Sequence, residues 1–260
     1  MVMPVSELEE LVTKRRDFLA ALSESPATKP ELVERLDTSR STVDRGISDL
    51  EHFDFVCRPA DQYQLTMAGR AAYERHQSYL DDLRDIQRAS DVISLLSPEV
   101  PFSFGLLEDA EIQVAESHDP HQPLELAADI MSKAIRVRKV SPAVFPLCVQ
   151  ALEEWMEDGR TVDLVVTSDV LETLTNRYRD EVSCLEHPEH NLYELQSTPP
   201  YALWVAETPE GEYTGLMPTS ETGVEGLVIT DSDDACRWAL EQYESYLERA
   251  TVVESLGERT

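Results

Sequence analysis

Lysine is scarce in this chain, and acidic residues far outnumber basic ones. Only four of the 22 basic residues are lysine, whereas aspartate and glutamate number 51, for a formal net charge of −29. Such a charge ordinarily repels the phosphates of a nucleic acid. Acid excess spread along a whole chain is also typical of proteins adapted to molar salt, where net charge maintains solubility and the Debye length is about 3 Å at 1 M. We therefore expect a halophilic source, and the acidity does not exclude DNA as a partner.

Glycine is also rare, with nine residues in 260. The chain contains no Walker phosphate loop, no Gly-x-Gly-x-x-Gly and no Gly-x-Ser-x-Gly. These motifs need glycine where the backbone approaches a phosphate closely or turns sharply around a nucleophile. Their absence argues against enzymes that depend on them.

Cysteines are few and scattered, and long apolar runs are lacking. The four cysteines have no framework spacing, and no apolar run approaches 18 residues. A disulfide scaffold and a membrane-spanning helix are both unexpected, as is a signal peptide. We expect a cytoplasmic protein without a membrane partner, and 260 residues allow one or two domains.

Two short helices separated by a turn are predicted near the N-terminus. Thr28 is a helix cap and Pro30 suits the first turn, so a helix is expected over residues 28–37. A second helix is expected over residues 39–50, with Ser39 as its cap and apolar residues spaced to face inward. We expect Gly46 to pack closely against another helix. The pattern is that of a helix-turn-helix.

The outward face of the second helix is polar and carries donors for DNA. Arginine grips a guanine edge with two hydrogen bonds, and serine or threonine contacts bases or phosphates. A recognition helix needs such groups near its N-terminus. An alternative is a small helical bundle without a ligand. The predicted DNA contacts on this helix are Arg40, Ser41, Thr42, Arg45 and Ser48.

A hairpin and an upstream helix complete a predicted winged helix. Strands are expected over 55–58 and 62–66, and Arg58 at the hairpin rim is placed to contact DNA. One helix is expected over Val5 to Leu22. The predicted DNA-binding domain spans residues 1–68. Residues 1–97 carry 12 basic and 18 acidic residues and the remainder 10 and 33, so the acid excess is mostly elsewhere.

A long helix is predicted to join two domains. Residues 67–96 contain no proline, and apolar positions recur in a heptad pattern over about three repeats. We expect residues 69–97 to be a linker helix that forms a homodimer, which would place two recognition helices on a palindromic operator. The alternative is a helix packed against its own domain. The predicted dimer contacts are Tyr79, Leu83, Ile86 and Ile93.

Strands and helices alternate over residues 98–260, which predicts an α/β effector-binding or regulatory domain with parallel and antiparallel parts. The whole chain is thus expected to be α+β, with a winged helix-turn-helix, a long linker helix and an α/β sensor-like domain. Helices are expected over 123–137, 143–157, 169–178 and 235–250, and strands over 112–115, 162–166, 191–195, 201–206, 213–217 and 226–230.

The arrangement of these segments resembles a known family. A winged helix followed by Ser141-Pro142, by Val162-Asp-Leu-Val-Val166 and by Gly226-Leu-Val-Ile-Thr-Asp231 is similar to archaeal helix-turn-helix regulators typified by the methanogenesis and filament regulatory protein. The resemblance implies a transcription regulator whose second domain senses a signal or mediates assembly. That domain is also similar in outline to the sensor domain of archaeal sugar-responsive regulators, which looks like a phospholipase D fold without its catalysis.

No catalytic role is predicted. Phospholipase D chemistry needs a histidine nucleophile with lysine two positions later, and none of the six histidines has lysine there. No cofactor is expected. A small-molecule effector is expected near strand ends, where α/β sheets bind ligands. The residues assigned to it are Ser141, Thr167 and Ser168, although Ser141 is equally explained as a helix cap.

Two histidine pairs offer a competing metal-sensing hypothesis. Histidine and cysteine at short spacing bind zinc and related metals. Both pairs lie in proline- and acid-rich segments, where solvated histidine is ordinary. The alternative ligands are His118, His121, Cys184, His187 and His190.

The favoured prediction is therefore a dimeric regulator that binds double-stranded DNA. The rival class is a winged-helix interaction module that binds a protein such as a general transcription factor. The operator, the target genes and the direction of regulation cannot be read from the residues.

Overall fold

The computed structural model describes residues 4–116, 118–146, 148–149, 159–187, 189–220 and 223–256. The chain divides into two compact units, Met1–Arg84 and Asp85–Thr260. None of the described helices is both long and apolar enough to cross a membrane. The predicted helix over 143–157 lies largely outside the described residues.

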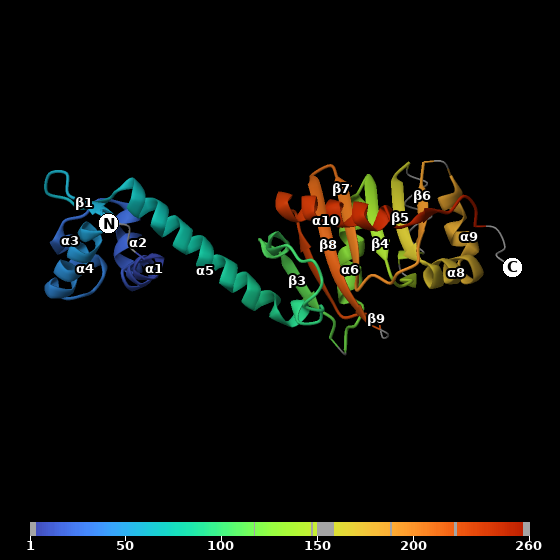
Figure 1. Ribbon diagram of the computed structural model, residues 1–260, viewed down its shortest axis with the longest axis horizontal. Coiled ribbons are helices and arrows are strands. Elements are labelled where there is room, and N and C mark those ends of the chain that lie inside the picture. Colours follow the sequence, from blue (N-terminus) through green and yellow to red (C-terminus); the bar gives the residue numbers. More distant parts are fainter. Residues whose placement is uncertain are drawn as a thin grey trace. The chain divides into compact units, whose positions relative to one another are not determined.

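The N-terminal unit is a winged helix. Its elements, labelled in Figure 1, are α1 (Val5–Lys14), α2 (Arg16–Glu24), α3 (Lys29–Arg35), α4 (Arg40–His52), β1 (Val56–Cys57), β2 (Gln64–Leu65) and the start of α5 (Met67–Ile93). Strands β1 and β2 pair antiparallel, and Ala27 bridges Tyr63 through two backbone hydrogen bonds of 2.9 and 2.8 Å. The wing is thereby joined to the segment that precedes α3.

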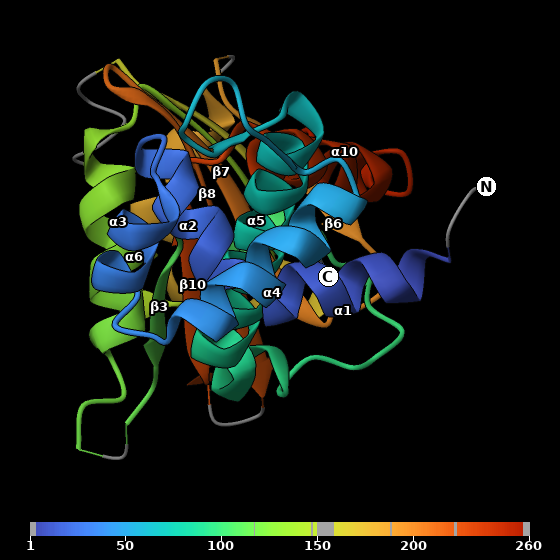
Figure 2. The same ribbon diagram turned by 90° about the vertical axis from the view of Figure 1, so that its left-hand side faces the viewer.

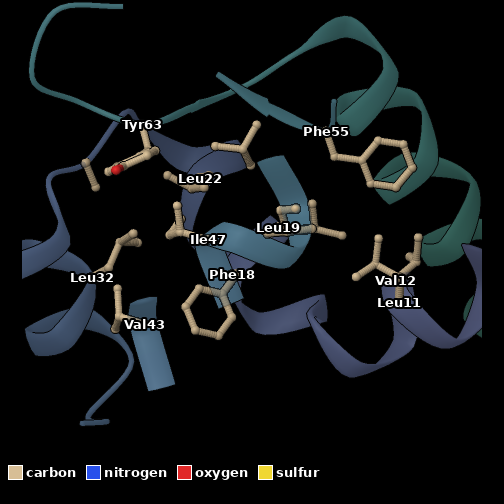
Figure 3. Close-up of a cluster of buried hydrophobic side chains, with 13 residues drawn as sticks. Leu11, Val12, Phe18, Leu19, Leu22, Leu32, Val43, Ile47, Phe55 and Tyr63 are labelled. Atoms are coloured by element: carbon tan, nitrogen blue, oxygen red, sulfur yellow. The ribbon is translucent and has the colours of Figure 1, made fainter. Parts of the chain in front are cut away.

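One apolar core holds these helices together. Leu19, Leu32, Val43, Ile47 and Leu50 have no exposed surface. Figure 3 shows their neighbours from α1, α2 and the wing converging on the same interior. Burial of each such side chain contributes roughly 1.5–3 kcal/mol. This core fixes which face of α4 remains outside.

The single helix expected over Val5 to Leu22 is wrong, because the chain forms two helices there. Arg15 leaves helical geometry, with φ −108° and ψ 16°. Its guanidinium donates to the Asp49 carboxylate of α4 through Nε at 3.0 Å and Nη2 at 2.5 Å. The local sequence contains no proline or glycine that would indicate the break. The interaction that helps to hold it comes from Asp49, 34 positions away.

The C-terminal unit is built on a mixed sheet with strand order β11-β6-β5-β4-β7-β8-β10-β3, and β9 pairs with β8. Strands β4, β5 and β6 are parallel, whereas β7, β8, β10 and β3 continue the sheet antiparallel. The strands are β3 (Glu111–Val114), β4 (Arg136–Ser141), β5 (Thr161–Thr167), β6 (Asn191–Leu195), β7 (Tyr201–Thr208), β8 (Gly211–Ser220), β9 (Gly223–Val224), β10 (Gly226–Thr230) and β11 (Thr251–Val252).

Helices cover both faces of this sheet. Helix α10 (Asp233–Leu247) packs on the face that carries Val140 and Val165. Helices α6 (Gln122–Lys133) and α8 (Ser168–Arg177) pack on the face that carries Val137 and Val162. Figure 2 shows α6 and α10 on opposite sides of β7 and β8. The short helices are η1 (Phe104–Leu107), α9 (Arg179–Val182) and η2 (Ser183–Glu186).

Strand β4 corrects the prediction of a helix that continues to Val137. Helix α6 ends at Lys133, and Ala134 is extended. The next residues, Arg136–Ser141, form β4, which is held between β5 and β7 in the sheet. Tertiary pairing overrides the helical pattern that runs in from α6. The α+β class and the mixture of parallel and antiparallel strands are confirmed.

Candidate nucleic-acid interface

Helix α4 is presented as a rigid element with one free face. The Ser39 side chain caps it by accepting from the Thr42 amide at 3.2 Å. Gly46 lies against Phe18 of α2, because a Cβ placed there would come within 2.7 Å of the ring. The predicted close helix packing at Gly46 is therefore confirmed. A capped, tightly packed helix holds its outward side chains in a defined register.

The outward face of α4 carries the predicted DNA contacts. Arg40, Ser41, Arg45 and Ser48 are exposed and Thr42 is half-buried. Among the described residues, neither Arg40 nor Arg45 has an ion-pair or hydrogen-bond partner. Their donors are free to meet an external acceptor.

The hydroxyl groups at the start of α4 form a local cluster. Ser39 Oγ lies 2.9 Å from both Ser41 Oγ and Thr42 Oγ1. A hydroxyl both donates and accepts, so this cluster retains acceptors and donors for water or phosphate. The four terminal amides of a helix add partial positive charge at the same end. The N-terminus of α4 is thus a polar, electropositive point on a strongly acidic chain.

Two of the three acidic residues of α4 are paired with cations from elsewhere in the N-terminal unit. Asp44 accepts from Lys29 Nζ at 2.6 Å, and Asp49 is bound by Arg15. The hydrogen bond to Asp44 is the main reason that the pKa of Lys29 rises above 10.5. Local pairing therefore offsets two carboxylates that would otherwise repel a phosphate backbone near Arg45.

The wing brings a second cationic group to this unit. Arg58 is exposed, pairs with Asp61 at 3.2 Å, and stacks 5.3 Å from the centre of the Tyr63 ring. Lys29 lies 5.8 Å from the same ring. Sequence reasoning identified Arg58 but missed Lys29 and Tyr63. The cap at Thr28 places Lys29 at the first position of α3, but nothing local indicates that Tyr63 lies beside it.

The predicted dimerisation seam on α5 is divided between different environments. Ile86 and Ile93 pack against a core of the C-terminal unit that includes Ala89 and Val92. Tyr79 and Leu83 remain 51% and 43% exposed. Two of the four predicted contacts are thus partly covered by their own chain. Heptad spacing does not distinguish a seam covered by a partner from one covered by the same chain.

The residues assigned to an effector site lie at the ends of β4 and β5, where Ser141 pairs with Val166, the neighbour of Thr167. Ser141 lines a cavity of about 370 Å³ on the α6 and α8 side of the sheet, and its hydroxyl donates to the Ala143 carbonyl at 2.9 Å. Thr167 and Ser168 are not among the lining residues. The Thr167 side chain instead caps α8 by accepting from the Val170 amide at 3.3 Å.

The two histidine pairs lie at different parts of the C-terminal sheet. His118 follows β3 at one edge, whereas His187 and His190 precede β6, and five strands lie between β3 and β6. Strands are spaced about 4.8 Å apart, so more than about 20 Å separates the pairs. Within the described ranges, no group of three or more histidine, cysteine, aspartate or glutamate side chains is arranged to hold a metal. The two pairs therefore do not come together as one ligand set, and metal binding by either pair alone stays a prediction.

His190 has a structural role. Its Nδ1 accepts a hydrogen bond from the Val162 amide at 3.3 Å, which only a ring unprotonated at Nδ1 can do. Burial lowers the pKa of His190 below 6.5, and the nearby His187 lowers it further. The rings of His187 and His190 lie 5.9 Å apart.

Both parts of the chain match known protein families. Residues 120–249, half of the chain, match the middle domain of the methanogenesis regulatory protein FilR1. The chain belongs to the FilR1 family. Residues 7–88 match a second family, the HVO_A0261 N-terminal domain, which covers the winged helix and most of α5. The FilR1-family resemblance read from the residues is therefore confirmed, and the winged helix matches a known domain as well.

Solved structures with a similar course of the chain are distant in sequence. TrmBL2, described as an archaeal chromatin protein, is 14% identical, with 94% of this FilR1-family chain and 98% of that chain covered and a TM-score of 0.43. Nuc of Salmonella typhimurium, a phospholipase D family member, is 15% identical over 56% of this chain and 100% of that chain, with a TM-score of 0.40. NucT of Helicobacter pylori is 15% identical over 56% and 99%, with a TM-score of 0.42. No curated protein sequence matches the chain.

Proposed function

We propose that this FilR1-family protein is a sequence-specific transcription regulator of a halophilic archaeon that binds double-stranded DNA in the cytoplasm. Helix α4 enters the major groove, and Arg40 and Arg45 read base edges. The observation that carries the proposal is that these two guanidinium groups are exposed and have no partner among the described residues, whereas Asp44 and Asp49, two of the three carboxylates of the same helix, are paired. On a chain of net charge −29, free arginine at this position is what a base-reading surface needs.

The remaining contacts have distinct roles in this proposal. Ser41, Thr42 and Ser48 bind phosphates or bases beside the arginines, since hydroxyl groups serve either acceptor. Arg58 on the wing exchanges its exposed partner Asp61 for a phosphate. Surface ion pairs of this kind contribute about 0–1 kcal/mol, so the exchange costs little.

The protein acts as a homodimer in this proposal. Tyr79 and Leu83 form an exposed apolar pair one helical turn apart on α5. A two-fold dimer through α5 would place two copies of α4 on successive turns of a palindromic operator. The C-terminal domain then carries the sensing function, and residues 1–68, 69–97 and 98–260 serve as the DNA-binding, linker and regulatory parts.

A mobility-shift assay in molar potassium chloride tests DNA binding. We expect Arg40→Ala and Arg45→Ala each to weaken operator binding by about 1–3 kcal/mol, the range of a bidentate base contact. Arg177→Ala is the matched control, because it removes the same charge from an exposed residue of α8 in the other unit. Equal binding by the wild type and both α4 variants would exclude this helix as the reader. A shift seen only with a general transcription factor would favour the protein-interaction alternative.

A further inference from the structure

The C-terminal domain contains a cavity with mainly apolar walls. It has a volume of about 370 Å³ and lies over β4 and β5, between α6 and α8. Small-molecule sites occupy about 300–1,000 Å³, so the cavity is of ligand size. Its described walls are mainly apolar, with Met131 of α6, Val166 of β5 and Leu174 of α8 on three sides. An occupant must therefore present a mostly apolar body.

One cation is buried in this apolar wall. Lys139 of β4 is 8% exposed and lines the cavity. Its Nζ lies 5.3 Å from the centre of the Phe145 ring. A buried ammonium is strongly disfavoured unless a counter-charge or hydrogen-bond acceptors replace its water. A single aromatic face offsets only part of that cost, about 0.5–2 kcal/mol.

Three other polar residues that line the cavity, Ser132, Ser141 and Arg160, are already engaged in hydrogen bonds. Ser132 Oγ donates to the Asp129 carbonyl at 2.7 Å, and Ser141 donates to Ala143. The Arg160 guanidinium donates to the Ser132 carbonyl. Across the described part of the chain, Lys139 alone among these four has no hydrogen bond and no ion pair. The cavity wall thus presents one ammonium group that lacks a counter-charge among the described residues, and its surroundings are mainly apolar.

We propose that this cavity binds a small carboxylic acid with an apolar alkyl or aromatic body, and that Lys139 holds the carboxylate. The apolar walls of α6, β5 and α8 take the body of the ligand. One ammonium matches one monoanion, whereas a phosphate dianion would need further donors that the engaged side chains do not supply. A buried pair is screened much less than a surface pair, so the interaction persists in molar salt.

The site also deepens the proposed function, because such an acid would be the signal that the regulatory domain senses. That consequence rests on the proposed function, whereas ligand binding itself does not. Ser141 is the one residue of the predicted effector set that reaches the cavity. The sequence predicted β5 but not β4, the strand that carries Lys139, because a helix was expected to continue to Val137.

Calorimetry on the full chain tests the proposal with octanoate as the probe, in molar potassium chloride so that chloride competes for the ammonium. We expect octanoate to bind one molecule per subunit, and acetate and octanol to bind at least about tenfold more weakly, since each lacks half of what the cavity recognises. Equal affinity for octanoate and octanol, or no octanoate binding, would overturn the proposal.

Two lysine variants test whether Lys139 is the cation that holds the carboxylate. Lys139→Met keeps the length of the side chain and removes the charge, and we expect it to weaken octanoate binding by about 10- to 100-fold, the range of one hydrogen bond to a charged group. Lys133→Met is the control, since Lys133 is exposed on α6 and pairs with Asp129. Unchanged octanoate affinity in Lys139→Met would overturn the assignment. If that variant does not fold, the comparison of octanoate, octanol and acetate on the wild type still decides.

The proposed ligand site and the proposed DNA binding are tested by independent experiments, so either can be rejected without the other. Calorimetry without DNA reports the cavity alone, and the mobility shift without octanoate reports α4 alone. Octanoate binding by a protein that shifts no DNA would retain the cavity assignment and reject the regulator.

Discussion

Two glycines of the N-terminal unit mark places where the backbone admits no side chain. A Cβ at Gly69 would lie 2.0 Å from the Phe55 carbonyl oxygen, and a Cβ at Gly46 would meet the Phe18 ring. The Gly69 amide also donates to Thr66 Oγ1 at 3.0 Å. Gly69 therefore sets the point at which α5 leaves the wing, and the obstruction is backbone that cannot rotate away.

Gly69→Ala is expected to destabilise the N-terminal unit by about 1–3 kcal/mol, the usual cost of overpacking, despite the better helix propensity of alanine. Denaturant unfolding followed by circular dichroism measures the change. Ala68→Ser is the control, because Ala68 is exposed at the adjacent position. An unchanged or raised stability in Gly69→Ala would show that the wing and α5 do not meet as closely as described.

His190 links stability of the C-terminal unit to pH. Its lowered pKa means that folding favours the neutral ring, with burial as the main cause, His187 adding to it, and Glu189 and Asp163 opposing it. The stabilising contribution is present above the unfolded pKa of about 6.5 and is lost as the pH falls through the lower folded value. Protonation at Nδ1 would also remove the acceptor for the Val162 amide.

Thermal unfolding at pH 7.5 and pH 5.5 tests this role. We expect the melting temperature of the wild type to fall on acidification, and to fall less in His190→Gln. His121→Gln is the comparison, since His121 is exposed at the start of α6. An equal fall in wild type and His190→Gln would mean that other groups carry the pH dependence.

Helix α5 is one continuous element with three environments along it. Ala72 and Tyr73 join the winged-helix core, and Ile86 and Ile93 join a core of the C-terminal unit. Between them, Tyr79 and Leu83 are exposed. Unlike the apolar residues of α5 that join the two cores, this pair has surface left for a partner helix in the proposed dimer.

The double variant Tyr79→Glu and Leu83→Glu is expected to convert the proposed dimer to a monomer. The substitutions remove apolar side chains from the two-fold contact and place carboxylates opposite one another, where they repel. Sedimentation in molar potassium chloride measures the mass. Ser78→Glu adds a charge to another face of α5 and is expected to leave the mass unchanged. A wild type that sediments as a monomer would reject the dimer outright.

Charge acts at the scale of the whole molecule. Residues 98–260 hold 33 of the 51 acidic residues, whereas residues 1–97 hold 12 of the 22 basic ones. The Debye length grows from about 3 Å at 1 M salt to about 10 Å at 0.1 M, so dilution extends the reach of the acidic surface to the DNA phosphates. Counterion release has little to contribute in concentrated salt.

Operator affinity is therefore expected to fall when potassium chloride is lowered from molar concentration to 0.1 M, the reverse of ordinary DNA-binding proteins. A titration of the mobility shift at several salt concentrations measures it, with circular dichroism at each concentration to confirm that the protein stays folded. Affinity that rises steadily on dilution would show that cationic contacts to phosphate outweigh the net charge.

Much of the architecture could be predicted because its signals are local. The caps at Thr28 and Ser39 and strands β6 and β10 were predicted where they occur. The break at Arg15 and strand β4 could not be predicted, since each depends on a partner elsewhere in the chain. Asp49 holds the first, and β5 with β7 holds the second.

By itself, the sequence determined the winged helix, the long α5, the α+β class and the family, because caps, apolar spacing and turn residues act over a few neighbouring positions. Only the tertiary structure decided which charges remain free. It paired Asp44 and Asp49, left Arg40 and Arg45 without partners among the residues that the structure describes, and placed Lys139 in the wall of a mainly apolar cavity. Ion pairing and burial depend on which distant residues meet, and that is settled by packing of the whole fold.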